Sequence, residues 1–240
     1  MTDSVEPTTD YWQRLLPAGS AAEAGAGSVY RFGYPARLPD GCVLMLPIRR
    51  RPHPPGRAVA SLIANHASFE VIDALAAFMA EISRPLAPEV VVGMPTLGLT
   101  LAAPIARLLG HHNYVPLGYS RKFWYDEGLS EPVSSITTPQ AGKNVYLDPN
   151  LVPRLAGRRV VVVDDTISSG STAAAVVRLL ARVDADPAGL VFAMCQGDAW
   201  RARLDPPWNG RVRWVFRSPL LRAVPGGWAV DYGDASAPPR

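Results

Sequence analysis

Short apolar runs alternate with amphipathic segments through the middle of the chain, and this alternation predicts its main elements. Apolar runs typical of buried strands occur at 90–92, 114–117, 144–147, 160–163 and 190–195. Between them, apolar residues recur at helical spacing over 69–82, 101–108 and 176–183. Strands that alternate with helices predict an α/β fold, in which a parallel sheet is flanked by helices.

The region before this alternation has the pattern of a hairpin. Residues 29–38 and 42–48 are predicted strands, joined by a Pro-Asp-Gly turn at 39–41. Pro presets φ in such a turn and Gly tolerates a positive φ, so the connection has a physical basis. Residues 49–56 contain three Arg and three Pro and are expected to form a stiff basic connector.

The two ends of the chain carry weaker signals. Residues 1–28 are rich in Ala, Gly, Pro and acidic residues, which predicts a loosely ordered lead-in. A predicted strand at 211–216 is followed by a tail that Pro and Gly interrupt. We expect one domain over 29–240, with its core at about 60–195, because a chain of this length buries one substantial core.

Composition describes a folded protein without a signal for nucleic acid or membrane binding. Hydrophobic residues make up 48% and charged residues 19% of the 240 positions, which separates the chain from disordered proteins. The net charge is +3 and the basic residues are scattered, so no nucleic-acid surface is expected. No apolar run has transmembrane length, and residues 1–10 lack the features of a signal peptide. Cys42 and Cys195 are predicted to be free thiols. A cytoplasmic protein is therefore expected. All basic residues except Lys122 and Lys143 are Arg, which draws attention to these two.

The segment 160–172, VVVVDDTISSGST, is the most informative stretch of the chain. Its valines suit a strand buried on both faces, and Asp164 and Asp165 follow at the carboxyl end, where open α/β sheets place their ligands. A turn of small hydroxyl residues then enters a helix, so backbone N–H groups, hydroxyls and the helix N-terminus form a phosphate-binding cradle. No Lys follows Gly170, which excludes a Walker loop. An ordinary buried strand and capped helix would leave the acidic pair unexplained, since burying two unpartnered carboxylates is costly.

This strand, acidic pair and turn resemble the phosphoribosyl pyrophosphate motif of type I phosphoribosyltransferases, in particular the purine-type enzymes for adenine or xanthine. The similarity covers roughly residues 90–195 and is specific only at the cradle. It implies the type I phosphoribosyltransferase fold, with a small variable hood built from the chain termini, here residues 29–58 and 196–240. Ser169 and Ser171 stand where the family often has Thr and Gly, which keeps the small, hydroxyl-rich character.

The resemblance implies a reaction of nucleotide salvage, in which ribose 5-phosphate passes from phosphoribosyl pyrophosphate to a nitrogenous base, here a purine, and pyrophosphate is released. Asp164 and Asp165 are then the catalytic pair, which faces the ribose hydroxyls and binds Mg²⁺ directly or through water. Gly170 is expected where the backbone comes closest to the 5′-phosphate. The predicted 5′-phosphate ligands are Thr166, Ser168, Ser169, Gly170, Ser171 and Thr172. Both a monomer and a homodimer remain open.

Pyrophosphate is expected to bind the loop at 94–100, which lies between a predicted strand and a helix. Thr96, Leu97 and Gly98 form its centre, and Gly98 lets the backbone approach a diphosphate closely. Adenine-type members of the family usually carry a basic residue where this chain has Leu97, so the charge must come from elsewhere. A plain strand–turn–helix connection is the alternative for this loop.

A mobile flap is expected over residues 120–143, because an aperiodic stretch of this length is unusual in a compact domain. Its opening pair, Arg121 and Lys122, resembles the Arg-Lys pair of adenine phosphoribosyltransferases and would close over the diphosphate. A solvated basic pair on a surface loop is the simpler alternative.

Two other kinds of protein are alternatives to a phosphoribosyltransferase. A non-catalytic regulator would sense phosphoribosyl pyrophosphate with the same fold, but the chain has no helix-turn-helix or concentrated basic face, which favours an enzyme. A synthetase that makes phosphoribosyl pyrophosphate would require an ATP site and a longer chain. The base itself has several candidate stacking partners in the hood, although aromatics at alternate strand positions are more often core. These aromatics are Tyr30, Phe32, Tyr34, Trp200, Trp214, Phe216 and Trp228.

Overall fold

The centre of the molecule is a five-stranded sheet in which all neighbouring strands are parallel, in the order β10-β9-β8-β4-β5. The structure is a computed structural model that describes residues 10–19, 27–133 and 143–232. The central strands are β4 (Val90–Gly93), β5 (Val115–Pro116), β8 (Arg159–Ile167), β9 (Asp186–Gln196) and β10 (Val212–Ser218). The predicted parallel sheet is confirmed.

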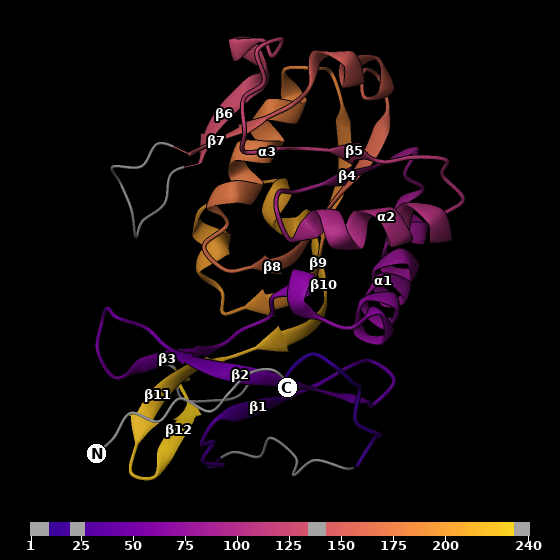
Figure 1. Cartoon of the computed structure of the whole chain (residues 1–240). Helices are drawn as coiled ribbons and strands as arrows, with labels where there is room; N and C mark the ends of the chain where they lie inside the picture. Colours follow the sequence, from indigo (N-terminus) through magenta and orange to yellow (C-terminus); the bar gives the residue numbers. More distant parts are fainter. Residues whose placement is uncertain (1–9, 20–26, 134–142, 233–240) are drawn as a thin grey trace.

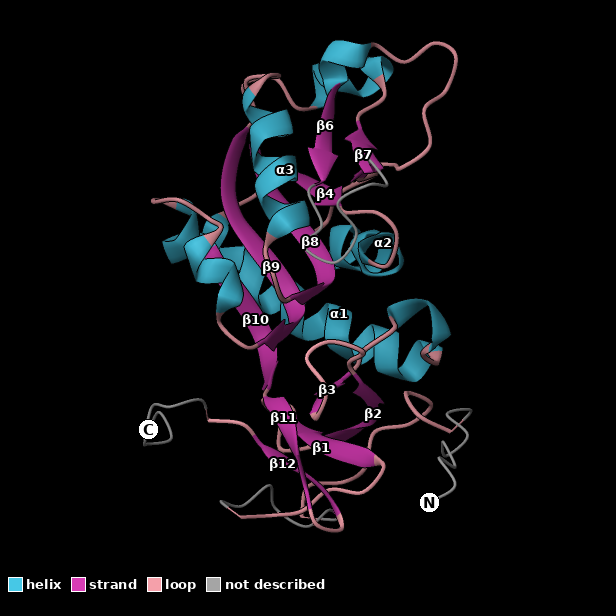
Figure 2. Cartoon of the chain, turned by 90° about the vertical axis from the view of Figure 1, so that its left-hand side faces the viewer, coloured by secondary structure: helices cyan, strands magenta, loops and turns pink. Residues whose placement is uncertain are grey.

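Helices cover both faces of this sheet, as Figures 1 and 2 show from two directions. The helices are α1 (Phe69–Ser83), α2 (Gly98–Leu108) and α3 (Ser171–Ala181). In β8, Val161 and Val163 are buried in the core under α1 and α2, whereas Val160 and Val162 are buried in the core under α3. Side chains of a strand alternate between its faces, so four consecutive valines require apolar cover on both sides. No helix in the described ranges is long and apolar enough to cross a membrane.

Local chemistry sets the helix ends close to the predicted positions. The Ser68 Oγ accepts a hydrogen bond from the Val71 N–H at 3.3 Å and caps the start of α1. Gly110 follows α2 with φ +84°, a conformation that favours Gly at the end of a helix. Short 3₁₀ turns join several elements. They span Ala64–His66, Arg84–Leu86, Glu127–Leu129, Pro149–Arg154, Ala199–Ala202 and Trp208–Arg211.

A second, antiparallel sheet forms a hood below the central sheet in Figure 1. Its order is β1-β2-β3-β11-β12, so both ends of the described chain contribute strands to it. The hood strands are β1 (Gly33–Arg37), β2 (Val43–Arg50), β3 (Arg57–Ala60), β11 (Leu220–Val224) and β12 (Gly227–Val230). The hood contacts the end of β9, where the Gln196 side-chain amide donates to the Ala60 carbonyl at 2.9 Å.

Some predicted boundaries are wrong. The hood was expected to take residues 196–240, but β10 pairs with β9 and belongs to the central sheet. The connector predicted at 49–56 is shorter, because β2 continues through Arg50 and pairs with β3, which begins at Arg57. The interrupted C-terminal tail forms the hairpin β11–β12. Strand pairing across the fold decides these boundaries, and local sequence does not reveal it.

The N-terminal segment is also more ordered than predicted where it is described. Within 10–19, Trp12 is only 3% exposed, and its indole N–H donates to the Ser61 carbonyl at 3.1 Å. Leu16 forms an antiparallel bridge with Val43 at the end of the hood. The rest of the predicted lead-in, 1–9 and 20–26, lies outside the described residues.

A two-stranded ribbon, β6 (Ser130–Val133) and β7 (Lys143–Tyr146), lies along α3 (Figure 2). Buried Glu131 joins the ribbon to α3, because its carboxylate pairs with Arg178 at 3.0 Å and also with Arg182. The strand predicted at 144–147 therefore exists, but in this ribbon and not in the central sheet. Part of the predicted flap thus has regular structure, and its residues 134–142 lie outside the described residues.

Candidate active site

Strand β8 delivers two carboxylates to the edge of the central sheet that faces the hood. Asp164 and Asp165 follow the buried valines and are themselves 8% and 5% exposed. Strand β10 ends at Ser218, and the chain enters hood strand β11 at Leu220, so the carboxyl ends of these parallel strands point toward the hood. Open α/β sheets bind their ligands at this edge.

Burial controls the charge of this pair. Loss of solvation raises the pKa of Asp165 to about 6. It also raises the pKa of Asp164 well above its usual value, and repulsion from Asp165 adds to the effect. The Asp165 N–H donates to Asp164 Oδ1 at 2.9 Å, which fixes the two groups relative to each other. Two buried carboxylates with disfavoured anionic forms are suited to bind a cation or sugar hydroxyls.

A pocket of about 220 Å³ opens beside the acidic pair. All six predicted 5′-phosphate ligands line it, together with Asp164. Asp165 is not part of its wall, because neighbouring side chains of a strand point to opposite faces. Thr166, by contrast, does line the pocket, and its Oγ1 is buried without a hydrogen-bond partner among the described residues. A buried hydroxyl without a partner is costly, so the pocket fits a ligand that hydrogen-bonds to it.

The first turn of α3 supplies further donors to the pocket. The N-cap residue of this helix is Gly170, which has no side chain, and Ser169 Oγ accepts a long hydrogen bond of 3.4 Å from the Ser171 N–H. The next N–H groups of a first turn have no partner within the helix and can donate to a ligand. The Ser169 hydroxyl lies 3.2 Å from that of Ser171, so both hydroxyls gather at the same end. N–H groups, hydroxyls and the positive helix end together match the predicted phosphate cradle.

Gly170 is required by the backbone of the turn and by its neighbour Trp200. Its φ is +77°, which a side chain rarely adopts, so Gly is required for the turn itself. A Cβ at this position would lie 3.1 Å from both the Cα and the Cβ of buried Trp200. The missing side chain therefore makes room for Trp200, and the close approach of this backbone to the 5′-phosphate stays a prediction.

The predicted pyrophosphate loop packs directly on the acidic pair. A Cβ on Gly98 would lie 2.6 Å from the Val163 carbonyl oxygen and 2.8 Å from Asp164 Oδ1, so only Gly fits there. Leu97 packs against the core under α1 and α2, whereas Thr96 is exposed. Thr96, Leu97 and Gly98 thus lie at the carboxyl end of β4, next to Asp164, and none of them is basic.

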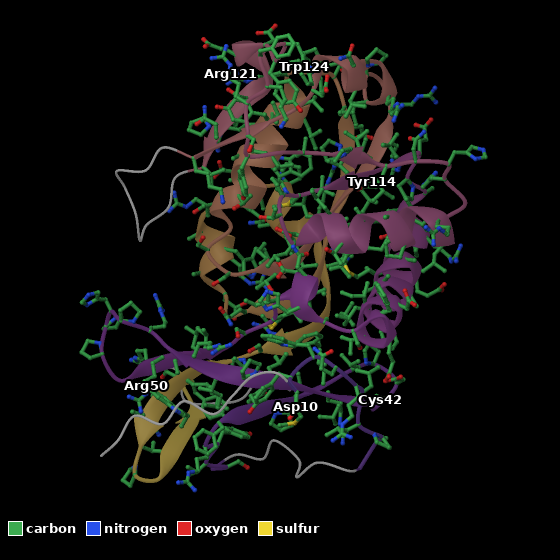
Figure 3. All side chains as sticks on the ribbon, viewed as in Figure 1. Asp10, Cys42, Arg50, Tyr114, Arg121 and Trp124 are labelled. Atoms are coloured by element: carbon green, nitrogen blue, oxygen red, sulfur yellow. The ribbon has the colours of Figure 1, made fainter. Side chains whose placement is uncertain are left out.

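The other predicted pyrophosphate ligands do not come together with this loop. Arg121 pairs with Glu127 at 2.8 Å, and both side chains are at least half exposed. Figure 3 places Arg121 beside Trp124 at the end of the molecule opposite the hood. Lys122 is exposed on the same loop. Their role at the diphosphate therefore stays a prediction.

Most of the predicted stacking aromatics are core residues. Trp200 is buried in the core under α3, and partly buried Trp214 packs against that core. Tyr30, Tyr34 and Phe216 are also buried. Sequence reasoning missed one aromatic that does reach the site, Tyr119. Its hydroxyl lies against the Thr172 side chain; burial raises its pKa, and Asp164 and Asp165 raise it further. The available signal was its position just after a predicted strand, at the same edge of the sheet.

The donor set fits Mg²⁺ that is shared with a substrate. Two carboxylates provide the hard oxygen ligands that Mg²⁺ prefers, and this ion commonly binds one or two carboxylates together with substrate phosphates. In the parts of the chain that the structure describes, no three His, Cys, Asp or Glu side chains gather into a site of their own. Asp164 and Asp165 would thus hold the ion only in part, with phosphate oxygens and water completing its shell.

Comparisons with known proteins agree with this geometry. The family model described as phosphoribosyl transferase domain matches residues 58–218. An adenine phosphoribosyltransferase of Synechococcus sp. is 34% identical over 116 residues, which cover 48% of this chain and 64% of that relative's length. An adenine phosphoribosyltransferase of Streptomyces coelicolor is 31% identical over 157 residues, which cover 63% of this chain and 79% of the relative.

The fold is also similar to that of a solved structure. The crystal structure of adenine phosphoribosyltransferase from Rhodothermus marinus matches with a TM-score of 0.56 and 21% identity. The match covers 72% of this chain and 93% of that one. At this level of identity the likeness supports the fold, with its parallel sheet and separate hood.

Proposed function

Because the chain belongs to the family of phosphoribosyl transferase domains, we propose that it transfers ribose 5-phosphate from phosphoribosyl pyrophosphate to a nitrogenous base and releases pyrophosphate. A purine is the proposed acceptor, since the relatives reported above are named adenine phosphoribosyltransferases. The observation that carries the proposal is the buried acidic pair beside a pocket lined by hydroxyls and the N-terminus of α3.

Each part of the proposed substrate has matching groups. The 5′-phosphate accepts hydrogen bonds from the first turn of α3, from the serine hydroxyls of the turn and from Thr166 Oγ1. The ribose hydroxyls donate to Asp164 and Asp165, which are buried and fixed by their mutual hydrogen bond. The diphosphate is placed at the loop of Thr96, Leu97 and Gly98, which packs against Asp164 because Gly98 has no side chain.

Positioning and electrostatics account for most of the proposed catalysis. As the bond to pyrophosphate breaks, positive charge develops on the sugar, and the nearby carboxylates stabilise it. When bound, Mg²⁺ would neutralise charge on the leaving diphosphate. The hood covers the edge of the sheet at which the base would bind, and it limits access of water to the reacting carbon.

The proposal is tested by incubating the full chain with phosphoribosyl pyrophosphate, Mg²⁺ and one of four bases, adenine, guanine, hypoxanthine or xanthine. We expect release of pyrophosphate with at least one purine. No release with any base, together with retained binding of phosphoribosyl pyrophosphate, would instead support a regulator that senses this compound. Failure to bind either phosphoribosyl pyrophosphate or ribose 5-phosphate would contradict both functions.

A further inference from the structure

A second pocket, of about 540 Å³, lies outside the proposed active site. It is bounded by the C-terminal half of α2 and by the segment that leads into β5. It shares no lining residue with the 220 Å³ pocket. Small-molecule sites usually have volumes of about 300–1,000 Å³, so this pocket is large enough to hold a ligand of its own.

This second pocket lies toward the edge of the central sheet that is opposite the acidic pair. Asn113 and Tyr114 come just before β5, at the amino end of a parallel strand, whereas Asp164 lies toward the carboxyl end of β8. Helix α2 connects the two edges, because it begins at Gly98 beside Asp164 and its 11 residues span about 16 Å. Figure 3 shows Tyr114 near α2 and away from the hood. A ligand in this pocket would therefore be separate from the substrate.

Five polar side chains line the second pocket, and none of them has a hydrogen-bond or ion-pair partner among the described residues. They are Arg107, His111, His112, Asn113 and Tyr114. The His111 Nε2 is also buried, so this nitrogen has lost water without gaining a partner from the described part of the chain. A buried polar atom in this state is costly. Polar groups that gather around a pocket without partners of their own are typical of a ligand site.

The charge of the second pocket favours an anion. Arg107 carries a permanent positive charge, and no Asp or Glu is among the lining residues. His111 and His112 can each donate a hydrogen bond, and each adds positive charge when it is protonated. A guanidinium can bind two oxygens of one phosphate at the same time. The pocket therefore suits a phosphate group.

The rest of the wall is apolar and suits an organic body joined to that phosphate. Ala103 and Ala106 provide small side chains from α2, and Pro116 contributes from β5. The ring of half-buried Tyr114 adds a flat surface on which a heterocycle can stack. The 220 Å³ pocket, which is proposed to hold a single phosphate group, has less than half of this volume. A free phosphate ion would thus leave most of the second pocket empty.

We propose that the pocket between α2 and β5 is a second binding site, which takes a small organic phosphate of the size of a mononucleotide. Arg107 and the two histidines bind the phosphate, and Tyr114 lies beside the base. The proposal concerns a different part of the molecule from the proposed active site and does not depend on the proposed function.

The test titrates adenosine 5′-monophosphate into the full chain by calorimetry, in the presence of saturating ribose 5-phosphate to occupy the cradle. We expect one equivalent of the nucleotide to bind to wild type. Arg107→Met should bind it at least ~10-fold more weakly, the scale of one charge-assisted hydrogen bond. Arg154→Met is the matched control, because it removes an exposed Arg outside both pockets, and its affinity should stay within about twofold of wild type.

Three further measurements identify what the second pocket recognises. Adenosine lacks the phosphate and inorganic phosphate lacks the base, so each should bind at least ~10-fold more weakly than the nucleotide. Ala103→Leu keeps a good helix former on α2 but fills part of the pocket, and it should weaken nucleotide binding to a similar extent. Its thermal stability and its affinity for ribose 5-phosphate should stay close to those of wild type.

Two results would overturn the assignment. One is that the nucleotide fails to bind wild type once ribose 5-phosphate is present, and the other is that Arg107→Met and Arg154→Met bind it equally well. Adenosine that binds as tightly as its monophosphate would likewise contradict a phosphate site. Failure of the proposed function looks different, because wild type would then show no turnover while its nucleotide binding still depended on Arg107.

Discussion

On the 5′-phosphate side of the proposed site, every predicted group comes from one segment of the chain, whereas the residues predicted for the diphosphate side come from two separate loops. Residues 164–172 bring the acidic pair, the hydroxyls and the helix N-terminus in a single strand–turn–helix unit. The residues predicted for the diphosphate side lie on two separate loops, one at Thr96–Gly98 next to Asp164 and an exposed one at Arg121 and Lys122. A contiguous motif can be identified in the sequence, but an assembled surface requires the fold.

The acidic pair belongs to both sides, and its loss should have the largest effect. The double variant Asp164→Asn/Asp165→Asn keeps the size of both side chains but removes the charge beside the sugar and the metal. We expect turnover to fall at least ~10²-fold, the scale of losing a preorganised electrostatic group. Steady-state release of pyrophosphate measures it, and circular dichroism verifies the fold. Near-normal turnover would show that the pair has no role in catalysis.

The same contrast explains how much the sequence predicted. Strand β8 and helix α3 were predicted because alternating burial and helical spacing are local properties, and α1, α2 and β4 were predicted for the same reason. Strand β3 and the hairpin β11–β12 were missed, because these short strands become regular only through pairing within the hood.

The functional site, like the fold, was predicted only where its residues are contiguous in the sequence. All six predicted 5′-phosphate ligands line one pocket, since they follow one another in the chain. Lys143 and Tyr119 are 24 positions apart, and nothing local in the sequence indicates their contact. The buried Glu131 that fixes the ribbon was not predicted either, because its arginine partners lie on another element.

The cradle should depend strongly on Gly170. Gly170→Ala combines the strain of a positive φ, about 1–2 kcal/mol, with a contact of 3.1 Å to Trp200. We expect binding of ribose 5-phosphate, measured by calorimetry, to weaken ~10-fold or more. Gly157→Ala is the matched control, because Gly157 has φ +68° but open space around the missing Cβ. If both variants lose only stability and neither loses affinity, the turn does not form the phosphate site.

Burial of the acidic pair predicts that the stability of the folded protein depends on pH. The pKa of Asp165 is raised to about 6 in the folded protein. Its contribution to folding stability is thus fully present below the unfolded pKa, near 3.9, and is lost as the pH rises through 6. Asp165→Asn should therefore stabilise the ligand-free protein by ~1–3 kcal/mol at pH 8 and have little effect at pH 4.

Thermal unfolding at several pH values measures this difference between variant and wild type. Asp148→Asn is a control of opposite sign, because a hydrogen bond from the Asn150 N–H lowers the pKa of Asp148. Removing that carboxylate should destabilise the protein at pH 8. An Asp165→Asn variant that is less stable than wild type at pH 8 would show that the carboxylate is already neutralised by another group.

Within the cradle, Thr166 should affect stability and binding in opposite directions. Thr166→Val replaces a buried hydroxyl that has no partner with a methyl group of similar size, so the ligand-free protein should gain about 1 kcal/mol. Binding of ribose 5-phosphate should weaken several-fold, since one hydrogen bond is lost. Ser168→Ala provides the comparison, because exposed Ser168 should lose affinity without a gain in stability. A stabilised Thr166→Val variant with unchanged affinity would place this hydroxyl outside the phosphate site.

Arg121 belongs to the predicted diphosphate side, and we expect its replacement to change stability and binding least. Its ion pair with Glu127 is exposed, and such pairs contribute about 0–1 kcal/mol, so Arg121→Ala should leave thermal stability nearly unchanged. We expect the affinity of the Arg121→Ala variant for pyrophosphate with Mg²⁺ to change less than about threefold. To bind the diphosphate, Arg121 would have to leave Glu127 and to move from the end of the molecule opposite the hood (Figure 3). Glu127→Gln separates the two effects, since it frees Arg121 without removing its charge. A loss of ~10-fold or more in Arg121→Ala, together with tighter binding in Glu127→Gln, would show that this segment closes over the diphosphate as the sequence suggested.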